Sequence, residues 1–128
     1  MTTADFHALL GRLAAGWTAR DDDGVAACFS EDVLYLDPVR YVLRGRSALR
    51  AFFADDGGYP QRTTWRNALF DEARQLGVAE YTYEGTHRFH GTVWIRLEND
   101  SIARWREYQH VDPREWEEFT GEEGPPWP

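Results

Sequence analysis

Apolar residues in the first part of the chain recur three and four positions apart, which is the spacing of one helix face. They are Phe6, Leu9, Leu10, Leu13 and Trp17. This pattern predicts an amphipathic helix over residues 4–20. The acidic run Asp21–Asp23 and Gly24 interrupts the helix and provides an N-cap for a short second helix that continues to Phe29.

The middle of the chain predicts two strands and a third helix. The run from Val33 to Asp37 is β-branched and aromatic, and Pro38 stops it. A short second strand is expected over 41–43, and a third helix is expected to begin at Ser47. The apolar positions around these helices predict core residues, namely Leu13, Phe29, Leu49 and Phe52.

The remainder of the chain alternates between β-branched or aromatic residues and polar residues. Four strands are expected, over Thr63–Phe70, Val78–Glu84, Thr86–Leu97 and Ile102–Val111, with a hairpin turn at 98–101. Helices followed by strands predict an α+β fold, in which a curved antiparallel or mixed sheet wraps around the helices. We expect a single domain over residues 1–128.

The end of the chain, residues 112–128, is acidic and rich in proline and glycine, so we expect a tail. It would be anchored only if an aromatic side chain of the tail docks on the domain. The candidates are Trp116, Phe119 and Trp127.

Charge and hydropathy exclude several classes of partner. The net charge of −8 argues against nucleic acid and anionic membrane surfaces, because both bind basic faces. No apolar run approaches the roughly 18 residues of a spanning helix, and the N-terminus lacks a signal-peptide pattern. We therefore expect a cytoplasmic protein.

Missing residue types exclude several kinds of catalysis. The chain has no lysine, so a Schiff base and a phosphate-binding P-loop lysine are excluded. Its one cysteine, Cys28, lies in an apolar stretch, and its three serines lack a nucleophile-elbow context. Any catalysis must therefore use carboxylates, tyrosines, histidines or arginines.

Two carboxylates fall on faces that are otherwise apolar. In the last hairpin, one face carries Phe89, Val93, Ile95 and Trp105 together with Glu107 and Gln109. Asp37 shares a face with Val33 and Tyr35. If Asp37 and Glu107 meet in one cavity, desolvation and repulsion would raise their pKa values and suit acid/base work. Alternatively, Asp37 is a turn residue that bonds backbone amides, and Glu107 pairs internally with an arginine.

The opposite face of the last hairpin mixes aromatic residues with arginine. It carries His90, Trp94, Arg96, Arg104, Arg106 and Tyr108. Trp, Tyr and Arg are enriched in interface hot spots, so this face predicts a homodimer. The alternative is a solvated arginine face whose Trp94 is covered by the acidic tail.

Three stretches resemble the SnoaL-like branch of the nuclear transport factor 2-like superfamily. They are GWTARDDDGVAACFSEDVLYLDP, LRGRSALRAFF and SIARWREYQ. The superfamily includes ketosteroid isomerases, limonene epoxide hydrolases, scytalone dehydratases and polyketide cyclases. The resemblance implies a cone-shaped fold, and it also implies a dimer.

The resemblance also suggests roles for individual residues. Asp37 falls on the general-base position of the isomerases, and Glu107 falls on the acid/base position of the cyclases. The isomerase oxyanion donors are replaced by Leu13 and Val93, and Val93 with Ile95 occupies the region of the epoxide hydrolase relay. A steroid-isomerase-like reaction is therefore disfavoured.

These observations predict a cofactor-independent isomerase, cyclase or dehydratase acting on an apolar oxygenated molecule, such as a polyketide-like intermediate. Asp37 and Glu107 would transfer protons, with Tyr35, Tyr83 or His87 as hydrogen-bond donors. The expected cavity walls are Trp17, Phe53, Tyr83, Phe89 and Trp105. His87 and His90 fall on opposite strand faces, so no metal is expected. The alternatives are a non-catalytic binding or assembly module and an epoxide hydrolase-like activity.

Overall fold

The computed structural model describes residues 1–122 of the chain. Residues 123–128 lie outside the described part, and so does Trp127, one of the three aromatic residues considered for anchoring the tail.

Within residues 1–122, four helices form. They are α1 (Thr3–Ala19), α2 (Asp22–Ala26), α3 (Arg46–Ala54) and α4 (Trp116–Thr120). Thr2 and Asp5 form a capping box at the start of α1, and the Asp21 side chain caps α2. Helix α3 begins one residue before Ser47, and its N-cap is Gly45, whose φ of 89° suits glycine.

In the described part of the chain, six strands form one mixed sheet in the order β2-β1-β6-β5-β4-β3. They are β1 (Phe29–Asp37), β2 (Tyr41–Arg44), β3 (Arg62–Asp71), β4 (Leu76–Glu84), β5 (Arg88–Glu98) and β6 (Ser101–Val111). Strands β1 and β6 pair in parallel, and the other neighbours pair antiparallel. Asn99 and Asp100 take positive φ values in the predicted hairpin turn.

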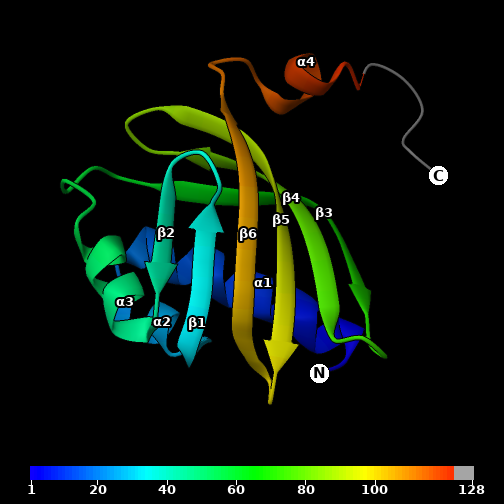
Figure 1. Cartoon of the computed structure of the whole chain (residues 1–128). Helices are drawn as coiled ribbons and strands as arrows, with labels where there is room; N and C mark the ends of the chain where they lie inside the picture. The colour runs from blue at the N-terminus through cyan, green and yellow to red at the C-terminus, as the bar shows by residue number, and fades with distance from the viewer. Residues whose placement is uncertain (123–128) are drawn as a thin grey trace.

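Helices α1, α2 and α3 cover the concave face of the curved sheet, and this arrangement confirms the α+β prediction (Figure 1). Strand alternation places Val93 and Ile95 on this face with no exposed surface. Tyr35 and Trp105 are register partners on β1 and β6, and their rings stack with centroids 5.2 Å apart. The centre of the core is therefore a β1–β6 contact.

Three of the four predicted core residues are confirmed and one is wrong. Leu13, Phe29 and Leu49 have no exposed surface, but Phe52 is 39% exposed. Phe52 is the neighbour of the buried Phe53 on α3, but α3 lies at the edge of the sheet. The Phe52 side chain therefore lies at the border of the core. There the Phe52 ring packs on Tyr41, with centroids 4.8 Å apart.

The C-terminal segment packs on one end of the convex face through α4. Trp116 is buried, and Phe119 stacks on His90 with ring centroids 4.4 Å apart. His90 lies on the outer face of the sheet, as predicted, but it is only 2% exposed, because α4 covers it. Trp94 remains 43% exposed, so the described part of the tail does not cover it.

Within residues 1–122, no helix is both long and apolar enough to cross a bilayer.

The difference in burial between Phe29 and Phe52 predicts unequal effects of truncation. Phe29→Ala should lower the free energy of unfolding by about 3–5 kcal/mol, because it opens a cavity in the core. Phe52→Ala should lower it by only about 1 kcal/mol, because the ring is already partly in water. Urea unfolding of both variants measures the two values, and equal losses would contradict this division of the core.

Candidate functional site

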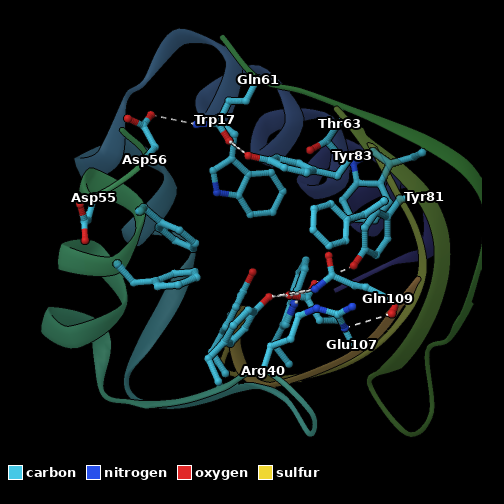
Figure 2. A pocket seen from close by; sticks show the side chains of 17 residues that line it. Trp17, Arg40, Asp55, Asp56, Gln61, Thr63, Tyr81, Tyr83, Glu107 and Gln109 are labelled. Carbon is cyan, nitrogen blue, oxygen red and sulfur yellow. Dashed lines mark hydrogen bonds between the residues drawn. The ribbon is translucent and has the colours of Figure 1, made fainter. Parts of the chain in front are cut away.

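The helices and the concave face of the sheet enclose a cavity of about 240 Å³ (Figure 2). This is slightly below the range of roughly 300–1,000 Å³ that is usual for ligand pockets, so it suits a molecule of one or two rings. Its walls are mainly aromatic, and they comprise Trp17, Tyr35, Tyr41, Phe52, Phe53, Trp65, Tyr81, Tyr83, Phe89 and Trp105. The polar lining comprises Arg40, Asp55, Asp56, Gln61, Thr63, Glu107 and Gln109.

The structure places the five wall residues expected from the sequence in this lining. They are Trp17, Phe53, Tyr83, Phe89 and Trp105. Tyr35 also lines the cavity, stacked on Trp105, whereas Tyr83 donates its hydroxyl to Gln61 Oε1 at 3.1 Å. Sequence alternation therefore located the walls correctly, and their role toward a substrate stays a prediction.

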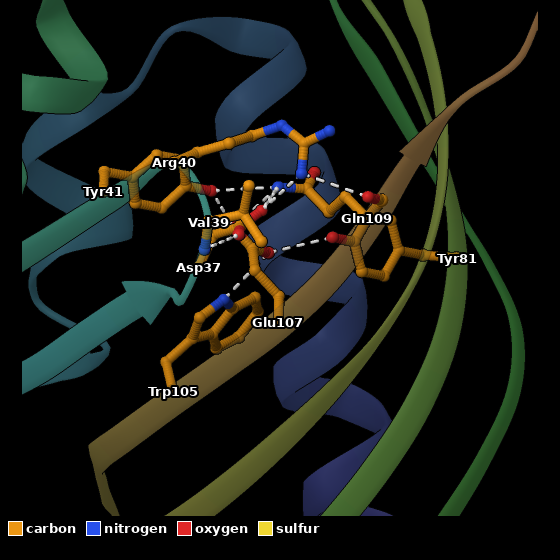
Figure 3. A network of polar contacts seen from close by, with 8 residues as sticks. All are labelled: Asp37, Val39, Arg40, Tyr41, Tyr81, Trp105, Glu107 and Gln109. Carbon is orange, nitrogen blue, oxygen red and sulfur yellow. Dashed lines mark hydrogen bonds and ion pairs between the residues drawn. The ribbon is translucent and has the colours of Figure 1, made fainter.

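Glu107 lies on the cavity floor and is 4% exposed. Its Oε2 accepts hydrogen bonds from Tyr81 Oη at 2.9 Å and from Trp105 Nε1 at 3.0 Å (Figure 3). Its Oε1 accepts hydrogen bonds from Tyr41 Oη and, at 3.4 Å, from Gln109 Nε2. A carboxylate in an aromatic cavity thus has donors on both oxygens.

A glycine makes room for one of these donors. Gly91 is the register partner of Tyr81 on the neighbouring strand. A Cβ at position 91 would lie 2.8 Å from both Cζ and Oη of Tyr81, which is closer than real Cβ contacts. The missing side chain therefore leaves the space through which the Tyr81 phenol reaches Glu107.

Burial raises the pKa of Glu107, because the aromatic surroundings disfavour the charged form. The hydrogen bonds from Tyr41, Trp105 and Tyr81 act in the opposite direction, and the nearby Asp37 charge raises the pKa again. The net result is a raised pKa. Burial, followed by the Glu107 charge, also raises the pKa values of Tyr35, Tyr41 and Tyr81, so these phenols stay protonated as donors.

Asp37 differs from the expectation of a base that opens into the cavity. It is 1% exposed, but it is not among the lining residues. Its Oδ1 accepts the Val39 amide at 2.9 Å, and its Oδ2 accepts from Arg40 Nη1 and from Gln109 Nε2, each at 3.0 Å. Burial alone would raise the pKa of Asp37, but these three bonds outweigh it and lower the pKa. Asp37 is therefore a buried turn carboxylate that holds Arg40 and Gln109.

Gln109 connects the two carboxylates. Its Nε2 lies 3.0 Å from Asp37 Oδ2, 3.1 Å from Tyr41 Oη and 3.4 Å from Glu107 Oε1. Because an amide nitrogen carries two hydrogens, it can serve only two of these oxygens at once. Asp37 and Glu107 therefore belong to one network, although only Glu107 lines the cavity.

His87 was expected beside Phe89 on the concave face, and this position is wrong. Strand β5 begins at Arg88, so the alternation does not extend back to residue 87. His87 is an exposed residue of the β4–β5 turn, where its carbonyl accepts the Gly85 amide at 3.0 Å. It does not line the cavity.

Three residues of the hydrogen-bond network around Glu107 and Asp37 were not predicted from the sequence as site residues. Tyr41 was expected only as part of a short strand, and no role was expected for Arg40 or Tyr81. Tyr81 could have been found, because it shares a strand face with Tyr83, whereas the contacts of Tyr41 and Arg40 depend on how β1 meets β6. Within residues 1–122, no three side chains of His, Cys, Asp or Glu come together as a metal-binding group.

Comparison with known proteins gives a family and a fold. Residues 10–105 match the model of the SnoaL-like domain. An epoxide hydrolase of the LEH-like type from M. tuberculosis is 16% identical, with a TM-score of 0.69 and 80% of each chain covered. A protein of unknown function with a cystatin-like fold from Methylobium petroleophilum is 13% identical, with a TM-score of 0.77. The match covers 100% of this chain and 98% of that one.

A third similar structure contains a small ligand. It is a hypothetical protein with a ketosteroid isomerase-like fold from Catenulispora acidiphila, in complex with trimethylamine. It is 18% identical, with a TM-score of 0.68, and the match covers 78% of this chain and 83% of that one. No curated protein matches the chain. At these identities the solved structures establish the fold alone.

The raised pKa of Glu107 predicts a pH dependence of stability. The folded chain holds the Glu107 proton more tightly than the unfolded chain does. The protonated carboxyl group therefore contributes its full stabilisation below the unfolded pKa of 4.5, and this stabilisation is lost as the pH rises through the folded pKa. Glu107→Gln keeps a neutral side chain at every pH. Wild type should therefore lose stability relative to the Gln variant as the pH rises from about 4.5 through the folded pKa of Glu107. Urea unfolding across this range tests it, and a constant difference between the two proteins would contradict the raised pKa.

Proposed function

The chain belongs to the SnoaL-like domain family, and from that premise we propose a cofactor-independent enzyme that moves a proton on a small, largely apolar, oxygenated molecule. The observation that carries this proposal is the position of Glu107, a buried carboxylate of raised pKa on the floor of an aromatic cavity. General bases work best when their pKa lies near the working pH, and burial moves a glutamate in that direction. The reaction class is isomerisation, cyclisation or dehydration, with a polyketide-like intermediate as one fitting substrate.

In this proposal the two carboxylates have different roles. Glu107 exchanges the proton with substrate, and the Tyr41 and Tyr81 hydroxyls position its carboxylate through their hydrogen bonds. Asp37 stays ionised and positions neighbouring side chains, because its lowered pKa makes it a weak base. Tyr35 and Tyr83 line the walls, where a substrate oxygen can reach them.

One observation favours a second candidate, a non-catalytic binding module. Both oxygens of Glu107 already accept hydrogen bonds from the protein, as a purely structural carboxylate would. An epoxide hydrolase-like activity has less support, because β5 contributes the apolar Val93 and Ile95 to the buried face. The experiment below separates binding from proton transfer.

A carbon-acid exchange assay tests the proposed chemistry without the natural substrate. In D₂O, wild type should accelerate deuterium incorporation next to the carbonyl of 2-tetralone, a two-ring ketone, as followed by proton NMR. Glu107→Gln should slow the exchange by about 10²–10⁴-fold, because a general base contributes about that much. The wild-type rate should rise with pH as Glu107 ionises, with a midpoint above 4.5.

The same assay separates the candidates. If 2-tetralone quenches the fluorescence of the cavity tryptophans but takes up deuterium at the uncatalysed rate, the binding module is favoured. Exchange by the Gln variant at the wild-type rate would remove Glu107 from the mechanism.

We also propose that the convex face of the sheet forms a homodimer. Trp94 is 43% and Tyr108 is 50% exposed on this face, and the Arg106 guanidinium lies 5.9 Å from the Tyr108 ring centroid. Arg96 and Arg104 are exposed register partners on β5 and β6 of the same face. An exposed group of Trp, Tyr and Arg is typical of an interface centre.

Sedimentation velocity at micromolar concentration tests the dimer. Wild type should sediment as a dimer, and Trp94→Glu should sediment as a monomer, because it places a charge at the centre of an apolar contact. Tyr59→Glu is the matched control, since Tyr59 is an exposed aromatic residue of the α3–β3 loop. A wild-type monomer, or a dimer unaffected by the Trp94 change, would contradict this interface.

A further inference from the structure

Within residues 1–122, Arg40 is the only cation among the side chains that line the cavity, and the proton transfer proposed for Glu107 gives it no role. It follows β1 in the short turn before β2, three residues after Asp37. Its side chain is 33% exposed, so part of the guanidinium is accessible from the cavity or from solvent.

Hydrogen bonds hold one nitrogen of the Arg40 guanidinium. Arg40 Nη1 donates to Asp37 Oδ2 at 3.0 Å and to the Gln109 carbonyl at 3.0 Å. The guanidinium carbon also lies 5.5 Å from the centroid of Phe89, a cavity wall. One nitrogen thus uses both of its hydrogens, and the aromatic contact fixes the plane of the group.

The other two nitrogens of Arg40 remain available. Within residues 1–122, neither Nε nor Nη2 makes a hydrogen bond to protein, although both carry hydrogens. Figure 3 shows them on the edge of the guanidinium that is turned away from Asp37 and Gln109. A planar edge with two parallel N–H groups matches a carboxylate, or the oxygen of a carbonyl or enolate.

We propose that Arg40 is the anion subsite of this cavity, and that the ligand is a small ring-containing carbonyl compound whose oxygen binds Nε and Nη2 of Arg40. The subsite would bind an anionic oxygen whether or not the chain is an enzyme. Its catalytic consequence rests on the proton transfer proposed for Glu107.

The proposed step balances without an external reagent. Glu107 takes a proton from the carbon next to the carbonyl, and the C–H electron pair forms the C=C bond of an enolate. The carbonyl π electrons move to oxygen, and Arg40 stabilises the resulting negative charge. The protonated Glu107 then returns a proton to carbon. Such oxyanion stabilisation is usually a large contribution to catalysis.

This role explains why a carboxylate is buried at the end of β1. Asp37 has three donors and a lowered pKa, and two of its donors are Arg40 and Gln109, which both line the cavity. Holding a guanidinium in one position before substrate binds removes the cost of ordering it later. Asp37 is then a positioning residue for Arg40.

An alternative ligand is a cation, because aromatic walls and a carboxylate also suit an ammonium group. Two probes with the same ring system distinguish these ligands, namely 2-naphthoate and 2-naphthylmethylammonium, with binding measured by calorimetry. Wild type should bind the anion more tightly than the cation. Arg40→Gln should weaken binding of the anion by about tenfold or more without weakening binding of the cation, because a hydrogen bond to a charged group is lost.

Three further variants control the measurement. Arg44→Gln removes an exposed arginine outside the cavity lining and should leave both affinities unchanged. Asp37→Asn/Arg40→Gln avoids an unpaired buried carboxylate if the single variant does not fold. Glu107→Gln should tighten binding of the anion, since it removes a neighbouring negative charge.

The binding outcomes decide the subsite. Four results would each overturn the proposed subsite. They are no binding of the anion, a wild-type preference for the cation, an unchanged anion affinity in Arg40→Gln, and equal losses of affinity for both probes. Selective loss of the anion would support it.

The exchange assay with 2-tetralone then tests the catalytic part separately. Arg40→Gln should lower kcat by about 10²–10³-fold, as expected for loss of an oxyanion donor. If neither wild type nor variant accelerates exchange but the anion loss is selective, the proposed enzyme fails and the subsite stands. If exchange depends on Glu107 and not on Arg40, the enzyme stands and the oxyanion role fails.

Discussion

The parallel pairing of β1 with β6 is the contact on which the cavity depends. It places Tyr35 beside Trp105 and brings the turn after Asp37 to the level of Glu107 and Gln109. Parallel strands cannot be joined by a tight turn, so everything between residues 37 and 101 serves as their connection. Strands β3, β4 and β5 of that connection then complete the cavity wall on the far side of β6.

The two buried carboxylates show how the surroundings of a side chain determine its chemistry. Glu107 lies among aromatic rings, and burial dominates over four donors, so its pKa is raised. Asp37 is equally buried, but an arginine and a backbone amide are among its donors, so its pKa is lowered. Two carboxylates within one network thereby differ in acidity, because Glu107 keeps its proton to a higher pH and Asp37 stays ionised to a lower pH than an ordinary carboxyl group.

Periodicity in the sequence predicted the features that depend on a single element. Strand alternation placed Glu107, Phe89 and Trp105 on the concave face, and helical spacing placed Phe53 there. It failed where an element ends, as at His87, one residue before β5 begins. It also could not predict that Tyr41 bonds Glu107, a contact between residues 66 positions apart that depends on sheet order.

The polar floor of the cavity is encoded almost entirely in two short stretches, residues 37–41 and 105–109, with Tyr81 as the exception. The wall residues that make none of these hydrogen bonds come from α1, α3, β1, β3, β4 and β5. Substitutions at these wall positions can therefore change the size and shape of the cavity while the hydrogen-bond network stays intact. In this architecture, ligand preference and the hydrogen-bond network around Glu107 can therefore change in separate evolutionary events.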